Sequence, residues 1–356
     1  MYMKYYFDQF SVLFTENEVH IGKQHLPLGQ CTTDILNMDP ELLTRIHEKS
    51  QTFAPAVDRL FKEKTRAAAV VAQEKLNDLW DLILTLPVYR DLNMDLPLSY
   101  NFLPIMLEKK EKWSQMQDEK SDPRAMLNSL VEGITTLAQD IQGFQSQIGG
   151  ILYFYIEPLK RRGAAAYAKA YAQYFHEMKS LEGFSDELSF EQSFPMESNF
   201  VPMRDPAKDG QLVLAEEATF SRLVHFLFVD FYRGLISGNA PRCCRNCGKF
   251  FLLTAGYNTC YCNNLAPGET ERTCRKVGAH KKEAKERITA TPAQKEYAKV
   301  YNRLKARKQR GKISVDEWNA SVAAALDLKD KAERGELSDD EYQKQMSAFA
   351  SDTHRR

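Results

Sequence analysis

The sequence predicts a mainly α-helical protein with a minor β component: a helical N-terminal domain, a small four-cysteine zinc module and a C-terminal helical tail. Apolar residues recur at helical spacing along much of the chain. Alternation typical of strands is limited to short pieces near residues 10–21 and 188–214. Six of the seven cysteines fall between Cys243 and Cys274. At 356 residues the chain exceeds the usual size of a single domain.

We expect the chain to divide into three parts. Residues 1–238 would form the mainly helical domain, with some strands. Residues 239–288 would form the zinc module, and residues 289–356 a basic helix followed by a tail of helical hairpins. Gly238-Asn239 ends the last helix of the first part and leads directly into the cysteines.

Apolar spacing and helix-start or helix-stop residues define the helices of the first part. One long helix is expected over residues 53–86, ended by Pro87, and others over residues 164–178 and 220–236. The clearest helix begins at Asp122-Pro123, a capping residue followed by proline at the first helical position. Short strands between residues 184 and 217 would pack against these helices.

The helix that begins at Asp122 carries apolar residues spaced alternately by three and four positions, from Leu127 to Ile148. Such a seam fits a dimeric coiled coil or a helix packed in an intramolecular bundle. The bundle is favoured because no pattern of paired charges flanks the seam. The oligomeric state stays open.

The composition narrows the class of protein. The formal net charge is zero, and 43% of the residues are hydrophobic, which is ample for a packed core. No signal peptide and no apolar run of about 20 residues is visible, so we expect a cytoplasmic protein without a membrane segment. In that compartment clustered cysteines are more often metal ligands than disulfides.

The cysteine cluster predicts one structural Zn²⁺ site. Cys244-x2-Cys247-Gly248 has the spacing of a zinc knuckle, in which two thiolates lie on a tight turn. The third ligand is Cys260 or Cys262, which would face the same side of an extended segment, so alternation does not choose between them. Cys274 is the preferred fourth ligand, with His280 as the alternative. Four thiolates leave no position for water, which makes such a site structural.

The cysteines outside the ligand set have a second interpretation. Cys31, Cys243 and Cys260 would be free thiols. A thiol among many lysines and arginines can become reactive, so Cys243 or Cys260 could serve as a redox sensor.

Positive charge is concentrated around and after the cysteines. Residues 241–312 contain eighteen Lys and Arg against five Glu, a formal +13 in a chain with no net charge. The helix expected over residues 292–310 is amphipathic, with basic residues opposite an apolar stripe. Such a surface could bind DNA or RNA phosphates. The candidate contacts are Arg242, Lys249, Arg275, Lys276, Lys281, Lys282, Lys295, Lys299, Arg303 and Arg310.

The tail contains an internal repeat, because residues 310–318 recur as residues 334–342. In each copy glycine stops one helix, and a serine with a glutamate three residues later forms a capping box that starts the next. We expect structural helical hairpins that dock on other parts or self-associate.

The motif Arg-x-Cys-x2-Cys-Gly-Lys-Phe-Phe, followed by Tyr261-Cys262 and Thr273-Cys274, resembles a zinc-finger family of uncharacterised Gram-positive bacterial proteins. More distantly, Cys247-Gly248-x-Phe250 and Tyr261-Cys262 are similar to CGNR-type zinc fingers. Those are treble-clef-like modules at the ends of bacterial proteins proposed to be transcription regulators. The resemblance favours Cys262 over Cys260 as a ligand and implies a regulator with an N-terminal sensing domain.

No catalytic signature is present. Residues 242–312 contain one histidine, His280, and no aspartate, so the metal site of a treble-clef nuclease is missing. His176-Glu177 lacks a second histidine four residues after the first, and no phosphate-binding loop occurs. Asp230, Arg233 and His225 could line a ligand pocket, but satisfied polar groups on a buried helix are the favoured interpretation.

We therefore expect a zinc-binding, non-enzymatic protein that associates with nucleic acid and regulates. The alternative is a scaffold for protein partners, in which the metal is purely structural and the basic residues dock on the acidic remainder of the chain.

Overall fold

The computed structural model describes residues 9–92, 101–182, 194–205, 210–254 and 259–349, except for the side chains of residues 181–182 and 282–289. The chain divides into two compact units, residues 1–262 and residues 263–356. The predicted fold class is confirmed: the protein is mainly helical with a minor sheet component and a cysteine cluster in its C-terminal half. The domain boundaries expected near residues 238 and 288 stay predictions.

A five-stranded antiparallel sheet in the first unit joins the start of the chain to a distant hairpin. Its strands are β1 (Phe10–Phe14), β2 (Glu18–Ile21), β3 (Gln24–Pro27), β4 (Met196–Asp205) and β5 (Gln211–Phe220), in the order β3-β2-β1-β5-β4. Phe10, Val12 and Phe14 are buried on one face of β1, as their alternation predicts. The strand piece expected near Leu188 lies outside the described residues.

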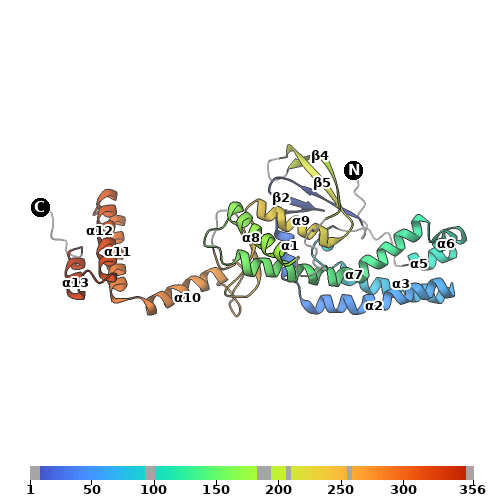
Figure 1. Ribbon diagram of the computed structural model, residues 1–356, viewed down its shortest axis with the longest axis horizontal. Coiled ribbons are helices and arrows are strands. Elements are labelled where there is room, and N and C mark those ends of the chain that lie inside the picture. The colour runs from blue at the N-terminus through green and yellow to red at the C-terminus, as the bar shows by residue number, and fades with distance from the viewer. Residues whose placement is uncertain (1–8, 93–100, 183–193, 206–209, 255–258, 350–356) are drawn as a thin grey trace. The chain divides into compact units, whose positions relative to one another are not determined.

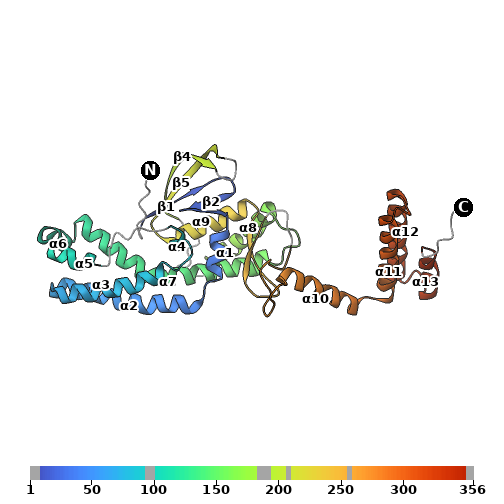
Figure 2. The ribbon, with the colours of Figure 1, turned by 180° about the vertical axis from the view of Figure 1, so that it is seen from behind.

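Helices cover the buried face of this sheet (Figures 1 and 2). The helices of the first unit are α1 (Gln30–Leu36), α2 (Pro40–Glu63), α3 (Arg66–Ile83), α4 (Tyr89–Leu92), α5 (Phe102–Glu108), α6 (Lys110–Gln117), α7 (Asp122–Ile151), the π-helix η1 (Leu152–Ile156), α8 (Ala164–Glu182) and α9 (Leu223–Ile236). Of these, α1 and α9 contact the sheet, whereas α2, α3, α5 and α6 extend beyond it. Helix α9 contacts β5, α7 contacts α9, and α2 packs on α7. The core of the unit lies between these layers.

The single helix expected over residues 53–86 is wrong, because two helices occupy this stretch. Helix α2 ends at Lys64, which adopts a left-handed conformation with φ +54°. Thr65 then caps α3, its hydroxyl accepting the backbone N–H of Ala68 at 3.2 Å. The chain reverses here so that α2 and α3 pack side by side.

The N-cap residue of α7 lies one position earlier in the chain than the sequence indicated. Ser121, not Asp122, is the N-cap, and its hydroxyl accepts the backbone N–H of Arg124 at 3.3 Å. The apolar seam from Leu127 to Ile148 is buried in the core of the unit, 7% exposed or less at every position. The intramolecular bundle is therefore the observed arrangement.

The second unit has a small core of its own. Its helices are α10 (Cys274–Thr289), α11 (Pro292–Gln309), α12 (Val315–Glu333) and α13 (Asp339–Ala348). Val300 and Leu304 of α11 pack with Ala325, Tyr342 and Met346 from the two helices that follow. This packing buries Val300 and Leu304 of the apolar stripe predicted for the basic helix, and Tyr297 of the same stripe is partly buried against this core.

Both predicted capping boxes of the tail are present. Ser314 and Glu317 start α12, and Ser338 and Glu341 start α13, each pair bonding in both directions. The preceding glycines, Gly311 and Gly335, have φ of +68° and +74° and end the helices before them. No helix of the described residues is long and apolar enough to cross a membrane.

Replacing Ser338 with alanine is expected to destabilise the second unit by about 1 kcal/mol, because the α13 N-terminus loses its cap. Ser347→Ala, at the other end of the same helix, is the matched control, since its hydroxyl bonds only the preceding turn. Differential scanning calorimetry of the two variants would measure the difference. Equal unfolding temperatures would contradict the capping role.

Candidate metal centre

The first two cysteines of the cluster lie on the turn of a β-hairpin. Strand β6 (Ala240–Cys243) pairs with β7 (Phe250–Leu253), and residues 244–249 connect them. The backbone N–H of Cys244 donates to the carbonyl of Lys249 at 2.9 Å, and that of Gly248 donates to the carbonyl of Cys244 at 2.9 Å. Gly248 has φ +75°, a conformation that glycine adopts without strain. The turn therefore directs Cys244 and Cys247 to one side.

The other two cysteines come from an extended segment and a helix start. Cys262 lies beside the knuckle, and its backbone N–H donates to Sγ of Cys244 at 3.4 Å. Cys274 is the first residue of α10, and the hydroxyl of Thr273 caps that helix by accepting the N–H of Lys276 at 3.3 Å. The N–H of Cys274 donates to the carbonyl of Asn264 at 2.8 Å. Short local bonds thus fix each cysteine.

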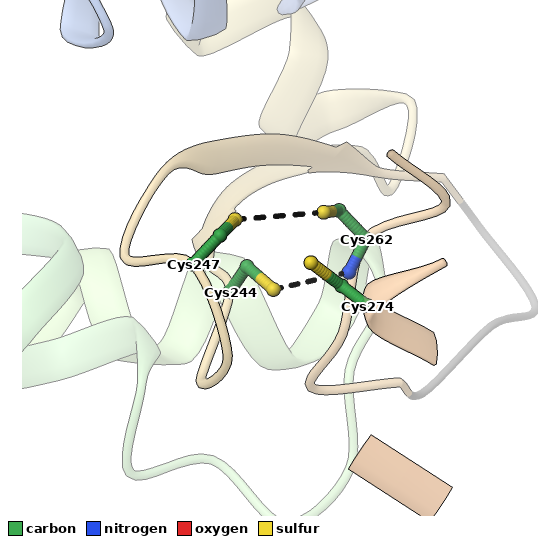
Figure 3. A group of neighbouring side chains, drawn as sticks. All are labelled: Cys244, Cys247, Cys262 and Cys274. Atoms are coloured by element: carbon green, nitrogen blue, oxygen red, sulfur yellow. Dashed lines mark hydrogen bonds between the residues drawn. The ribbon is translucent and has the colours of Figure 1, made fainter. Parts of the chain in front are cut away.

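The sulfur atoms of Cys244, Cys247, Cys262 and Cys274 all lie within 4.8 Å of one another (Figure 3). Sγ of Cys247 is 3.7 Å from Sγ of Cys262. A disulfide would need about 2.05 Å. A tetrahedral ion with metal–sulfur bonds of about 2.3 Å places its sulfurs roughly 3.8 Å apart. The cluster could therefore hold one metal ion of this geometry.

The surroundings of Cys244 favour its thiolate, the form that binds a metal. Cys244, Cys262 and Cys274 are 3% exposed or less. Burial would raise the pKa of the Cys244 thiol, but the backbone N–H groups of Cys262, Cys247 and Asn246 lower this pKa to about 7. Four sulfur ligands would fill a tetrahedral shell, so the arrangement suits a structural metal and offers no position for a reacting water.

The remaining candidates lie outside this group of four. Cys260 supports the knuckle turn through its backbone, because its carbonyl accepts a hydrogen bond from the N–H of Arg245 at 3.0 Å. Neither Cys260 nor His280 belongs to a metal-binding group among the described residues. Burial, with the nearby Cys244 and Glu157, raises the pKa of Cys243, and burial raises that of Cys31 well above its usual value. Neither thiol has the lowered pKa that redox sensing would use.

Arg242 was predicted to contact nucleic acid, and the structure corrects this. Its side chain is 5% exposed. Its Nη1 donates to the carbonyl of Thr259 at 2.8 Å, and its Nε lies 3.3 Å from the Glu157 carboxylate. Arg162 and Arg245 pair with the same carboxylate at 3.1 and 3.4 Å. The guanidinium of Arg242 therefore ties the hairpin to the end of η1, and it is not available for phosphate.

Most other predicted basic contacts are exposed. They are Lys249 on the hairpin, Arg275, Lys276 and Lys281 on α10, and Lys295, Lys299, Arg303 and Arg310 on or at the end of α11. Lys299 pairs with Glu296 at 3.0 Å on the helix surface. The side chain of Lys282 lies outside those that the structure describes.

Two features of the structure were not predicted from the sequence. One is Glu157 as the shared partner of three arginines. The other is a second group of metal-ligating side chains, Glu18, His20 and His25, in the N-terminal sheet. The alternating pattern of β2 and the Gly22-Lys23 turn after it were the available signals.

Two of the three polar residues singled out on α9, Asp230 and Arg233, are satisfied, as favoured, whereas Nδ1 of His225 is buried and makes no hydrogen bond with any described residue. Asp230 accepts the N–H of Gly29 and both the N–H and the hydroxyl of Thr32, each at 2.9 Å. Arg233 pairs with Glu216 at 2.7 Å and covers the ring of Phe14.

Comparison with protein-family models finds a match over the C-terminal part of the chain. A model of a family of unknown function, DUF6076, matches residues 191–352, which include the four cysteines and the tail helices. This confirms similarity to an uncharacterised family over the C-terminal part of the chain. No curated protein and no solved structure matches. The comparisons give no support to the CGNR-type similarity or to a Gram-positive origin.

Proposed function

We propose that this protein holds one structural Zn²⁺ on Cys244, Cys247, Cys262 and Cys274, and that its basic C-terminal segment binds nucleic-acid phosphates. Its role would be regulatory and non-enzymatic, with the N-terminal unit recognising a ligand or partner. The observation that carries the proposal is the outward basic face of α10 and α11, which follow the cysteine cluster in the chain.

Zinc is favoured among metals by the ligand type. Four thiolates select Zn²⁺ or iron–sulfur chemistry, and a single tetrahedral ion fits the spacing of 3.7 Å between Cys247 and Cys262. The metal would stabilise a short segment with little core of its own. The binding free energy of such a structural zinc is on the order of 10 kcal/mol and is coupled to folding.

Phosphate binding is supported by how α11 divides its residues. Val300 and Leu304 are buried against the helices that follow, whereas Lys295, Lys299 and Arg303 are exposed. A helix packed by one face presents its opposite face to a partner. The +13 charge of residues 241–312 would attract a polyanion over a distance limited by salt.

The runner-up function, a scaffold for protein partners, is favoured by the arginines of the hairpin. Arg242 and Arg245 pair with Glu157 of the N-terminal unit, so part of the positive charge serves packing. The exposed aromatic rings of Tyr153 and Phe154 lie on the adjacent η1. A scaffold would bind proteins and show no affinity for nucleic acid.

Binding to random-sequence duplex DNA and to single-stranded RNA, measured from low to physiological salt, separates the two functions. Phosphate binding is expected to weaken steeply as salt rises, because each neutralised phosphate releases counterions. No binding at low salt would remove the nucleic-acid proposal and leave the scaffold.

Reversing Lys295, Lys299 and Arg303 to glutamate is expected to weaken nucleic-acid binding by roughly 100-fold at low salt. The unfolding temperature should stay unchanged, because the three side chains are exposed. The matched control reverses three exposed lysines of the first unit, Lys62, Lys75 and Lys120, to glutamate, which changes the formal net charge by the same amount. Equal loss in both triple variants would show a nonspecific charge effect, and unfolding of the α11 variant would make its residues structural.

A further inference from the structure

The β2–β3 hairpin brings three metal-ligating side chains to one face of the sheet. Val19 and Ile21 of β2 are fully buried on the core side, so Glu18 and His20 point to the opposite side. The strand register pairs His20 directly with His25 of β3. Directly opposed residues of antiparallel strands share a face. The two imidazoles therefore meet there, with ring centroids 4.3 Å apart.

The register that produces this meeting is fixed by the turn. Gly22 has φ +57°, which a residue with a side chain adopts only with strain. A Cβ at Gly22 would also collide with the backbone carbonyl of Asp91. A one-residue slip would move His20 to the core side and separate the three groups. The hairpin geometry is thus strongly determined.

The imidazole of His20 is buried, and its Nε2 atom makes no hydrogen bond with any described residue. The His20 side chain is 6% exposed. A carboxylate oxygen of Glu18 lies 3.8 Å from that nitrogen, too far for a hydrogen bond. A buried polar atom in this state calls for an explanation such as an ion.

One ligand atom from each of Glu18, His20 and His25 lies within 4.8 Å of the other two. Around an ion with bonds of about 2.0 to 2.1 Å, neighbouring tetrahedral ligands are roughly 3.3 Å apart, so small side-chain rotations would close the set. Imidazole nitrogens select zinc-like transition ions over Mg²⁺ and Ca²⁺. We propose that Glu18, His20 and His25 form a second site, which binds a divalent transition-metal ion of the zinc type.

This site differs in kind from the four-cysteine cluster. Three protein ligands leave at least one coordination position for water or another ligand. His25 is exposed at the edge strand β3, so an ion can reach the site from solvent. The ion would exchange with its surroundings more readily than one enclosed by four buried thiolates.

The test adds Co²⁺ to the full-length, tag-free protein that has been stripped of metal and reconstituted with one equivalent of Zn²⁺, with uptake followed by equilibrium dialysis and absorption. The wild type is expected to bind a further equivalent whose spectrum lacks thiolate-to-cobalt charge transfer. His25→Ala and Glu18→Gln should each weaken this binding about 100-fold or more, because even outer-shell changes cost 10- to 100-fold. His176→Ala, an exposed histidine of α8, is the matched control and should bind as the wild type does.

Two results would overturn the site. One is the absence of a further equivalent in the wild type, and the other is undiminished binding in both His25→Ala and Glu18→Gln. Circular dichroism of the variants would verify that they fold. Cys247→Ser should keep this Co²⁺ binding, so the outcome is independent of the four-cysteine proposal and of nucleic-acid binding.

Discussion

Cys247→Ser is expected to lower metal affinity by more than about 100-fold and to unfold the cysteine segment locally. A serine hydroxyl is a poor ligand for a soft-thiolate site, and loss of a direct ligand costs more than the 10- to 100-fold of an outer-shell change. Because metal binding and folding of the segment are coupled, the variant should lose both bound metal and the folded structure of the segment. Zinc content after dialysis and protease sensitivity of residues 240–280 measure the two effects.

The neighbouring cysteines supply the matched controls. Cys243→Ser changes an exposed thiol next to Cys244, and Cys260→Ser changes one two residues from Cys262. Both variants should retain full zinc. Retention of metal by Cys247→Ser, or its loss in Cys260→Ser, would sink this ligand assignment.

Much of the fold could be predicted from the sequence because apolar spacing reports which face of a helix is buried. The seam from Leu127 to Ile148 is buried throughout, and the stripe of α11 packs as expected. The break at Lys64 could not be predicted, since no glycine or proline marks it. The break has a tertiary cause. The packing of α2 against α3 outweighs the cost of the left-handed conformation at Lys64, a conformation that residues with a Cβ disfavour.

The spacing of the cysteines along the chain predicts only part of the group of four that comes together in the structure. The knuckle follows from Cys244-x2-Cys247-Gly248, but Cys260 and Cys262 have the same parity and could not be told apart locally. In the structure the thiol of Cys262 reaches Cys247, while the carbonyl of Cys260 bonds the backbone of Arg245. That difference depends on how the segment crosses the hairpin, which no local pattern encodes.

Arg242 shows why a charge count overstates a binding surface. Its partner Glu157 is 85 positions away in the chain, so no window of sequence could join them. Burying a guanidinium is tolerated when a carboxylate and a carbonyl accept its donors, and here both do. The residues of α11 keep their exposure because that helix is amphipathic by itself.

Asp230→Ala is expected to destabilise the first unit by about 3 kcal/mol near pH 5. The side chain is fully buried and accepts three hydrogen bonds that hold the start of α1 on α9. Alanine would leave the N–H groups of Gly29 and Thr32 without an acceptor in the core, at about 1 to 3 kcal/mol each. Urea unfolding followed by the fluorescence of Trp80 and Trp113, in a Trp318→Phe background that silences the second unit, would measure the change.

The same residue predicts a pH dependence of stability. Burial raises the pKa of Asp230 from 3.8 to about 6, although its three hydrogen bonds act in the opposite direction. Because the folded state holds this proton more tightly than the unfolded state, the contribution to stability is full below about pH 4 and is lost as pH rises through about 6. The loss is on the order of 3 kcal/mol. This loss of stability should be absent in Asp230→Asn and present in the exposed control Asp81→Ala. The assignment would be contradicted if the wild-type stability rose between pH 4 and about 6 by more than that of Asp230→Asn.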